Sequence, residues 1–161
     1  KTAYEIGVRL VGSEMCIRDR LSTAHRELDG DKRADDLSMY KRAHLNHPST
    51  VWTRENKPHY DWLYKLFEAL SDEYTFRYSK IHTTDKQLRD ILRVPPTNIP
   101  NDMDFRQPPQ CMPDEYKCED SVIAYQQFYI GEKAHFSVWK KREVPVWYER
   151  TRSCKSVTNL K

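Results

Sequence analysis

The feature that most constrains the fold is a long run of apolar and aromatic residues at helical spacing in the middle of the chain. It extends from Pro58 to about Arg77 or Lys80. Large side chains recur there at steps of three and four residues: Tyr60, Leu63, Tyr64, Phe67, Leu70 and Tyr74. This is the period of one face of an amphipathic α-helix. The sequence therefore predicts the central helix of the domain in this segment.

The first twenty residues differ in character from the rest of the chain. They show no sustained helical or strand periodicity and lack the layout of a signal peptide. Back-translation of Leu10–Asp19 and of Lys1–Glu5 gives, in one reading frame, two constant parts of a transposase-based sequencing adapter. Ile6–Arg9 fill a gap of index length between them. We interpret residues 1–20 as an adapter-derived artefact and exclude them from the expected fold, the alternative being an ordinary amino-terminal strand and helix.

The stretch "LSTAHREL" that follows opens in the middle of a helix. Leu21, Ala24 and Leu28 share one helical face, and no capping pattern precedes them. We therefore expect residues 21–150 to form one helical domain that is truncated at its amino terminus, followed by a polar tail over residues 151–161.

Shorter helices are expected on both sides of the central one. "NHPSTVWTRE" places Pro48 in the first turn of a short helix, with Asn46 as its cap. "TTDKQLRDIL" contains a capping box, in which Thr84 bonds the amide three residues later and Gln87 reaches back. "ELDGDKRADD", around Gly30, indicates a charged turn.

A proline-rich segment from Val94 to Lys117 separates these helices from the last part of the chain. Its six prolines leave few amide donors for a helix or a ladder, which indicates a functional or mobile loop. Beyond it, Asp120 is expected to cap a helix that Gly131 bends. Residues that can share an inward stripe follow: Val122, Ile123, Tyr125, Tyr129, Phe136 and Trp139. The predicted fold class is all-α, a single helical domain with a long proline-rich loop.

Composition excludes several classes of protein. The formal net charge of +3 permits contact with nucleic acid without requiring it. Outside residues 1–20, the cysteines are Cys111, Cys118 and Cys154; they are odd in number and lack CxxC spacing, which argues against a disulfide framework and a structural zinc site and favours a reducing compartment. No apolar run is long enough to span a membrane. No glycine-rich phosphate loop is present, and no cofactor is expected.

Few residues have the pattern of a catalytic or metal site. His44 and His47 lie three residues apart, as two ligands of one metal on a helix can, but no third ligand accompanies them, so backbone hydrogen bonds explain them better. Two adjacent carboxylate pairs could act as acid and base, although a charged loop edge and a helix start explain them as well: Asp114 with Glu115, and Glu119 with Asp120.

Cations and aromatic rings alternate near the end of the chain, in "WKKREVPVWYERTR". The set comprises Trp139, Lys140, Lys141, Arg142, Trp147, Tyr148, Arg150 and Arg152. Aromatic faces can stack on unpaired bases while cations hold phosphates. The alternative is a core helix whose basic end favours the helix dipole, with Trp147 anchoring the tail.

Several motifs resemble a known group of proteins. "LSTAHR", "NHPSTVWTRE", "WLYKLFEALSDEYTFRYSKIH", "MPDEY" and "AYQQFYIGEKAHFSVWKKREVPVW" are similar to largely uncharacterised proteins of phages and environmental genomes, over nearly all of Leu21 to Tyr148. More distantly, NHP-x-x-x-W and the closing P-x-W-[YF] resemble pyrimidine dimer DNA glycosylases of the phage endonuclease V type. That resemblance implies a small helical repair enzyme.

The resemblance also implies where catalysis would reside. In such an enzyme the amino-terminal amine attacks the deoxyribose carbon of a damaged nucleotide and forms a Schiff base, a helix-borne glutamate assists, and a base is extruded from kinked DNA. Both groups would precede Leu21. Neither Lys1 nor Glu14 inherits these roles under the adapter interpretation, so no catalytic residue is carried over and the chain as given is expected to be inactive.

A DNA-binding surface is the part that can be carried over. By resemblance, His47 and Arg54 approach phosphate, and Trp147 and Tyr148 are the aromatic pair. Further candidates by charge alone are Arg26, Arg42 and Lys141. Trp147 and Tyr148 lead this set, and burial of Trp147 is the alternative.

Three functions remain open at this stage. The leading hypothesis is binding of double-stranded DNA, with glycosylase and lyase chemistry in the intact parent, in the cytoplasm of a bacterial or phage-infected cell. The rival is a non-catalytic phage protein that binds another protein through its helical face and the proline-rich loop. The third is a nucleotide-modifying enzyme whose site lay in the lost segment.

Overall fold

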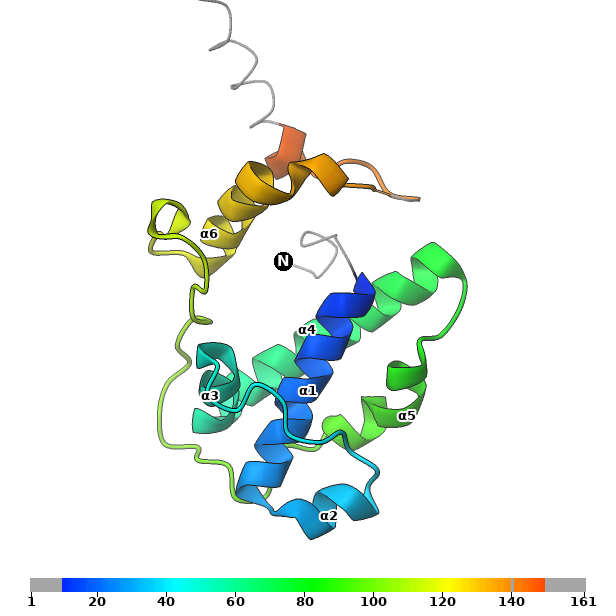
Figure 1. Ribbon diagram of the computed structural model, residues 1–161, viewed down its shortest axis with the longest axis vertical. Coiled ribbons are helices and arrows are strands. Elements are labelled where there is room, and N and C mark those ends of the chain that lie inside the picture. Colours follow the sequence, from blue (N-terminus) through cyan, green and yellow to red (C-terminus); the bar gives the residue numbers. More distant parts are fainter. Residues whose placement is uncertain (1–9, 140, 150–161) are drawn as a thin grey trace, which may run out of the picture.

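Helix α1 (Leu10–Leu28) crosses the middle of a helical bundle in the computed structural model (Figure 1). Helices α3 (Pro48–Glu55) and α4 (Lys57–Tyr78) pack against it, and α2 (Asp31–Asp36) and α5 (Thr83–Leu92) contact it as well. Because α3 and α4 both pack against α1, and α2 and α5 also contact it, α1 is covered on several sides.

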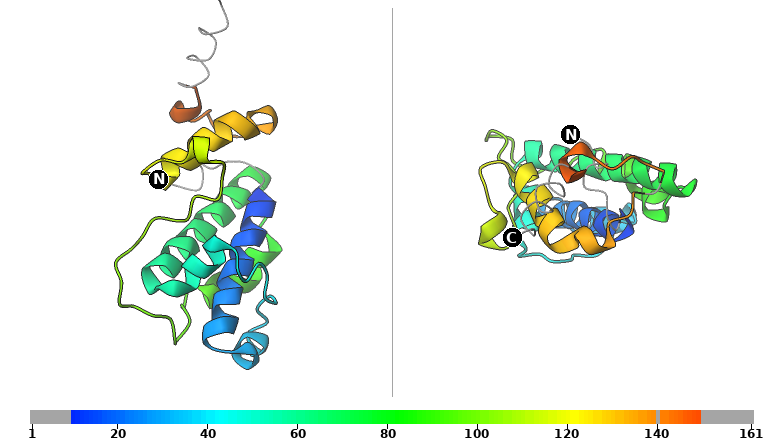
Figure 2. Two further views of the ribbon diagram at one scale, coloured as in Figure 1. Left: turned by 60° about the vertical axis from the view of Figure 1, so that its left-hand side comes forward. Right: turned by 90° about the horizontal axis from the view of Figure 1, so that it is seen from above.

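The structure describes residues 10–139 and 141–149, with helices and no strand among them. Later helical segments are η2 (Asp114–Tyr116), α6 (Ser121–Phe128), the π-helical turn η3 (Tyr129–Lys133) and the 3₁₀ turn η4 (Ala134–Phe136). Figures 1 and 2 show α6 and the segments after it at one end of the bundle. The predicted all-α single domain is confirmed. The polar tail expected over residues 151–161 lies outside the described residues.

The central helix predicted from the aromatic repeat is α4. Its bounds, Lys57–Tyr78, agree with the predicted Pro58 to Arg77 or Lys80, and Tyr60, Leu63, Phe67 and Leu70 are buried along it. At its end Ser79 adopts the left-handed conformation, with φ of 52°, which closes the last turn. The inward stripe of α4 agrees with the prediction at five of its six positions, and the sixth, Tyr74, is partly buried against the core.

Helix α1 is buried more completely than its sequence suggests. All six residues from Leu21 to Arg26 are buried, although four of them are polar. The helix also crosses the boundary expected after residue 20, and Ile17 and Arg18 are buried before it. The helical start before Leu21 agrees with the expectation that "LSTAHREL" opens in the middle of a helix.

Histidines, not the predicted residues, cap two of the helices. The Nδ1 atom of His47 accepts a hydrogen bond from the Ser49 amide at 3.1 Å, so His47 and not Asn46 begins α3. His82 accepts from the amide of Thr84 in the same way at the start of α5, which corrects the capping box built on Thr84. An imidazole acceptor placed two residues before the amide performs the task usually assigned to Ser, Thr, Asp or Asn.

Asp120 caps α6 as predicted, since its carboxylate accepts from the amides of Val122 and Ile123. The inward stripe expected after it is wrong in part, because Ile123 is exposed and Ala124 is buried in its place. The bend expected near Gly131 is a π-helical turn. A Cβ at Gly131 would collide with the end of the Tyr116 side chain, so a larger residue there requires the Tyr116 ring to move.

The charged stretch around Gly30 forms more than a turn. Gly30, with φ of 89°, begins the six-residue helix α2, which the sequence did not predict. A helix this short shows little periodicity, so tertiary contacts decide whether it forms.

The proline-rich segment has no helix or strand from residue 93 to residue 113. Buried side chains nevertheless fix its position. The amide of Arg106 donates to His59 Nε2 at 3.1 Å, the Trp52 indole donates to the Arg106 carbonyl at 3.1 Å, and Asn56 donates to the Met103 carbonyl. None of the described helices combines the length and apolar character that crossing a membrane requires.

Candidate nucleic-acid interface

Four aromatic rings pack together where the chain leaves η4. Tyr129, Trp139, Trp147 and Tyr148 have ring centroids 5.4–6.3 Å apart, mostly in edge-to-face geometry. Tyr148 is buried and its hydroxyl contacts the Ala134 carbonyl at 3.5 Å, while Trp147 is half-buried. Trp147 is thus partly buried, as the alternative prediction for this residue expected. The four rings form a small core of their own.

A cavity of about 420 Å³ opens beside this cluster. Its walls are Ala134, His135, Ser137, Trp139, Val144 and Tyr148. Two aromatic walls with a few polar groups and a volume of this size are typical of sites for small planar ligands. Burial raises the pKa of Tyr129. The Tyr129 hydroxyl accepts a hydrogen bond from the hydroxyl of Ser137, which lines the cavity.

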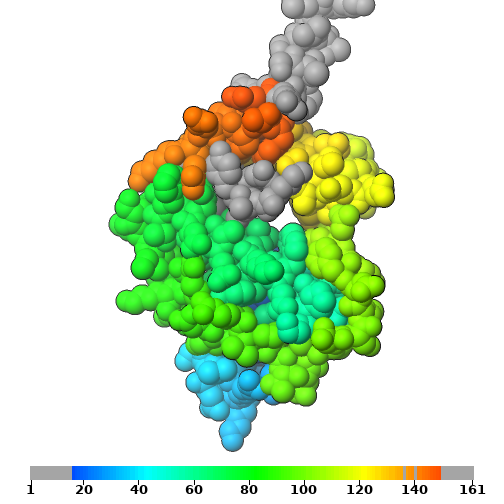
Figure 3. Space-filling model, turned by 180° about the vertical axis from the view of Figure 1, so that it is seen from behind, coloured from blue at the N-terminus to red at the C-terminus, as the bar shows by residue number. Residues whose placement is uncertain are grey.

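The segment that carries Trp139 also binds the bundle. We refer to residues 137–139 and 141–142 as the strap. Arg142 of the strap donates from Nη2 to the buried carboxylate of Glu73 on α4 at 2.8 Å, and Arg77 donates to the same carboxylate at 2.6 Å. Figure 3 shows the carboxyl-terminal segment, in orange, against the end of α4, in green. Glu73 is therefore the link between the bundle and the wall of the cavity.

Lys141 of the strap is exposed and holds the end of α4. Its ammonium lies 3.4 Å from the Phe76 carbonyl and 3.2 Å from the Ser79 hydroxyl. A cation at this position favours the helix carboxyl terminus. The structure thus gives this predicted DNA contact a structural role at the edge of the interface.

The five predicted site residues lie in two groups. His47 caps α3, and Arg54 donates to the Leu45 carbonyl at 2.8 Å, so both stabilise the entrance to α3. The other three follow η4 in the chain: Trp147 and Tyr148 belong to the aromatic cluster, and Lys141 contacts the end of α4. Among the predicted residues, the structure therefore brings Trp147 and Tyr148 into direct contact with each other.

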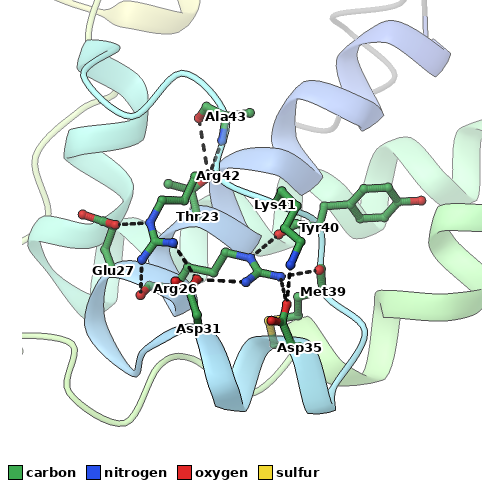
Figure 4. Close-up of polar contacts among 10 residues, drawn as sticks. All are labelled: Thr23, Arg26, Glu27, Asp31, Asp35, Met39, Tyr40, Lys41, Arg42 and Ala43. Atoms are coloured by element: carbon green, nitrogen blue, oxygen red, sulfur yellow. Dashed lines mark hydrogen bonds and ion pairs between the residues drawn. The ribbon is translucent and has the colours of Figure 1, made fainter.

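The two arginines proposed by charge alone occupy an ion-pair network where α1 meets α2 (Figure 4). Arg26 is 1 % exposed and donates to Asp31, Asp35 and the carbonyls of Met39 and Tyr40. Arg42 pairs with Glu27 and Asp31, which raises its pKa. Both guanidiniums are engaged within the protein, so their place is structural.

One carboxylate of each adjacent pair also has a structural partner. Asp114 pairs with Lys117, which lowers the pKa of Asp114, and Asp120 caps α6. Within the described part of the chain, no three His, Cys, Asp or Glu side chains gather as metal ligands would. Lys140, Arg150, Arg152 and Cys154 lie outside the described residues.

Sequence reasoning missed the carboxylate that organises the interface. Glu73 and Arg77 follow Leu70 at steps of three and four, so they continue the inward stripe of α4 with charged side chains. Charged residues at buried positions are rare unless paired, and this was the available signal. Comparison of the chain with protein-family models, with curated proteins and with solved structures found no match.

Proposed function

We propose that the chain binds DNA and holds one unstacked base in the cavity beside the aromatic cluster. The observation that carries this proposal is the cavity itself, which has Trp139 and Tyr148 as walls and opens next to the cationic strap. Stacking of a base on an aromatic ring is worth about 1–3 kcal/mol and tolerates any base. Nearby cations supply the attraction for phosphate, which depends on salt.

The proposed ligand is double-stranded DNA with a locally unpaired nucleotide, in the cytoplasm of a bacterial or phage-infected cell. A paired base lies inside the duplex and cannot enter the cavity, whereas an unpaired base enters at a lower cost. This distinction supplies the test, because a purely electrostatic surface would bind both duplexes equally.

Glycosylase and lyase chemistry belongs to the proposal only for an intact parent that carries an amine nucleophile and a glutamate before Leu21. The lyase step passes through a Schiff base, which borohydride reduces to a stable adduct. Recovery of the intact gene and trapping with abasic or ultraviolet-damaged DNA would test it. Failure to trap an adduct with the native amino terminus restored would remove the lyase chemistry and leave DNA binding as a separate proposal.

Binding itself is tested with two labelled duplexes, one fully paired and one with a single unpaired thymine. We expect fluorescence anisotropy to show tighter binding of the second duplex, and weaker binding of both as salt increases. Val144→Phe fills the cavity and should lower affinity for the unpaired duplex roughly tenfold, as loss of one stacked base implies.

Val146→Phe is the matched control, since Val146 lies two residues away, is 60 % exposed and does not line the cavity. It should bind both duplexes as the unchanged protein does. Equal binding of the paired and unpaired duplexes, or equal effects of the two substitutions, would contradict the proposal.

A second function is favoured by one observation on the proline-rich loop. Met103 and Phe105 are 42 % and 44 % exposed while the backbone next to them is fixed by His59, Trp52 and Asn56. A rigid loop with two exposed apolar side chains suits a protein partner. Salt-insensitive binding to a protein, without binding to DNA, would favour this function.

A further inference from the structure

Phe76, on the last turns of α4, is a large aromatic side chain at the surface. It is 45 % exposed, and the guanidinium of Arg142 lies over its ring with Cζ 3.8 Å from the centroid. Arg142 therefore covers part of the ring, and the rest remains open to solvent. Burial of an apolar core does not account for a ring in this position.

The guanidinium above Phe76 is held in a fixed orientation. Its Nε and Nη2 atoms both donate to the buried carboxylate of Glu73, at 3.2 Å and 2.8 Å to Oε2. Two donors of one planar fork on one carboxylate define the plane of the group as well as its position. Phe76 and Arg142 thus form a preorganised stack.

The stack adjoins the proposed base site through the strap. Trp139 lines the cavity, and Val138, its neighbour, is 56 % exposed and accepts a hydrogen bond from Arg77 at 3.4 Å. Lys141, which is exposed, reaches the Phe76 carbonyl. A strand that leaves the cavity along the strap would meet a cation and then an exposed ring.

We propose that Phe76, backed by Arg142, is a second stacking position for an unpaired base, so that the interface takes a short single-stranded segment of two or more nucleotides. This inference rests on the proposed function, whose site supplies the first position. Single-strand binding proteins combine the stacking of bases on aromatic side chains with cation–π contacts from arginine.

A length series of thymidine oligonucleotides, from the mononucleotide upward, tests the second position. The unchanged protein should gain roughly tenfold in affinity once the oligonucleotide is long enough to reach Phe76, because one more base is stacked. Phe76→Ala should bind the mononucleotide as the unchanged protein does and lose most of the gain. Because Phe76 is exposed, we expect the Phe76→Ala protein to fold normally. Its thermal unfolding temperature checks this.

Phe105→Ala is the matched control, since Phe105 has the same side chain and is 44 % exposed on the proline-rich loop. It should keep the full gain with length. Arg142→Lys retains the charge but loses the planar stack, so it should reduce the gain without abolishing the mononucleotide site.

The outcomes separate the two proposals. A gain with length that survives in Phe76→Ala, while Val144→Phe still weakens binding, would overturn the second position and leave the first. A loss in Phe76→Ala that is equal for all lengths would also overturn it. Failure of the unchanged protein to bind any oligonucleotide would remove the proposed function together with this inference.

Discussion

The two parts of α1 on either side of residue 20 meet the core differently. After it, Thr23 exchanges hydrogen bonds with the backbone of Ala43, His25 bonds the Tyr60 hydroxyl at 2.9 Å, and Arg26 fills its network. At residue 20 itself, Arg20 has a buried Nε atom without a hydrogen-bond partner among the described residues. The larger polar side chains of the later part thus have partners, whereas one nitrogen of the Arg20 guanidinium has none.

The unsatisfied atom of Arg20 belongs to a charged group, whereas those of the later part are neutral. Two neutral atoms of the later part, Ser22 Oγ and His25 Nδ1, also lack partners among the described atoms. A buried neutral group without a partner costs about 1–3 kcal/mol, and a charged one costs more. Ile17 and Arg18, from the same earlier part, pack into the core, so the difference concerns Arg20 alone.

The largest expected effect is the loss of stability when the contacts of Arg26, in the later part of α1, are removed. Arg26→Met leaves Asp31, Asp35 and two backbone carbonyls without the buried donor that joins them. Asp31 and Asp35 are half-exposed and keep Arg42 and Lys41 as partners, so the loss comes mainly from the two carbonyls, at about 1–3 kcal/mol for each one left unsatisfied. Urea unfolding should show this loss of stability, whereas a change within error would mean that α1 is not held by this network.

The next largest effect is expected from the protonation of His25, also in the later part of α1, as the pH falls. Burial lowers the pKa of His25 from 6.5 to about 4, so the folded protein keeps the imidazole neutral. The unfolded chain takes up a proton first as pH falls, and the free energy of unfolding should therefore decrease between pH 6.5 and 4, by about 3 kcal/mol. Above pH 6.5 the group contributes no pH dependence.

His25→Asn is the comparison, because it removes the titrating group. Unfolding free energies of both proteins measured across this range should converge at acid pH, since the unchanged protein alone loses the His25 contribution. Parallel curves would show that His25 is not the group responsible. His59, whose pKa burial also lowers, remains in both proteins and cancels.

A smaller change in stability, of opposite sign, is expected from a substitution at Arg20. Arg20→Met removes the buried Nε atom that lacks a partner, puts an apolar side chain in its place and should stabilise the protein by about 1 kcal/mol, the lower end for an unsatisfied buried group. Lys86→Met, at an exposed position on α5, is the control and should change stability by less than about 0.5 kcal/mol. A loss of stability in Arg20→Met would show that the guanidinium fits its site.

The sequence predicted what periodicity and local chemistry determine. The α4 stripe and the Asp120 cap depend on nearby residues, and both are confirmed. Asn46 and Thr84 were wrong as caps because histidine is an uncommon cap, and a propensity rule passes over His47 and His82. Helix α2 was missed because Arg26, from another element, holds its carboxylates.

The site was harder to predict than the fold. Trp139, Trp147 and Tyr148 could be singled out because they lie close together in the sequence. Glu73, which binds Arg142 across 69 positions, could not be paired with it, since nothing local distinguishes its partner from other arginines. Non-local ion pairs therefore set the limit of what one sequence shows about this interface.

The smallest expected effect compares two arginines of one network. Arg42 shares the carboxylate of Asp31 with Arg26, but its side chain is 38 % exposed where that of Arg26 is 1 % exposed. Water and salt screen exposed pairs, so Arg42→Gln should leave the urea midpoint close to that of the unchanged protein, and any difference should shrink as salt increases. Arg42→Lys, which keeps the charge, is its control. A loss for Arg42→Gln as large as that for Arg26→Met would mean that geometry within the network, and not burial, makes the later part of α1 fit.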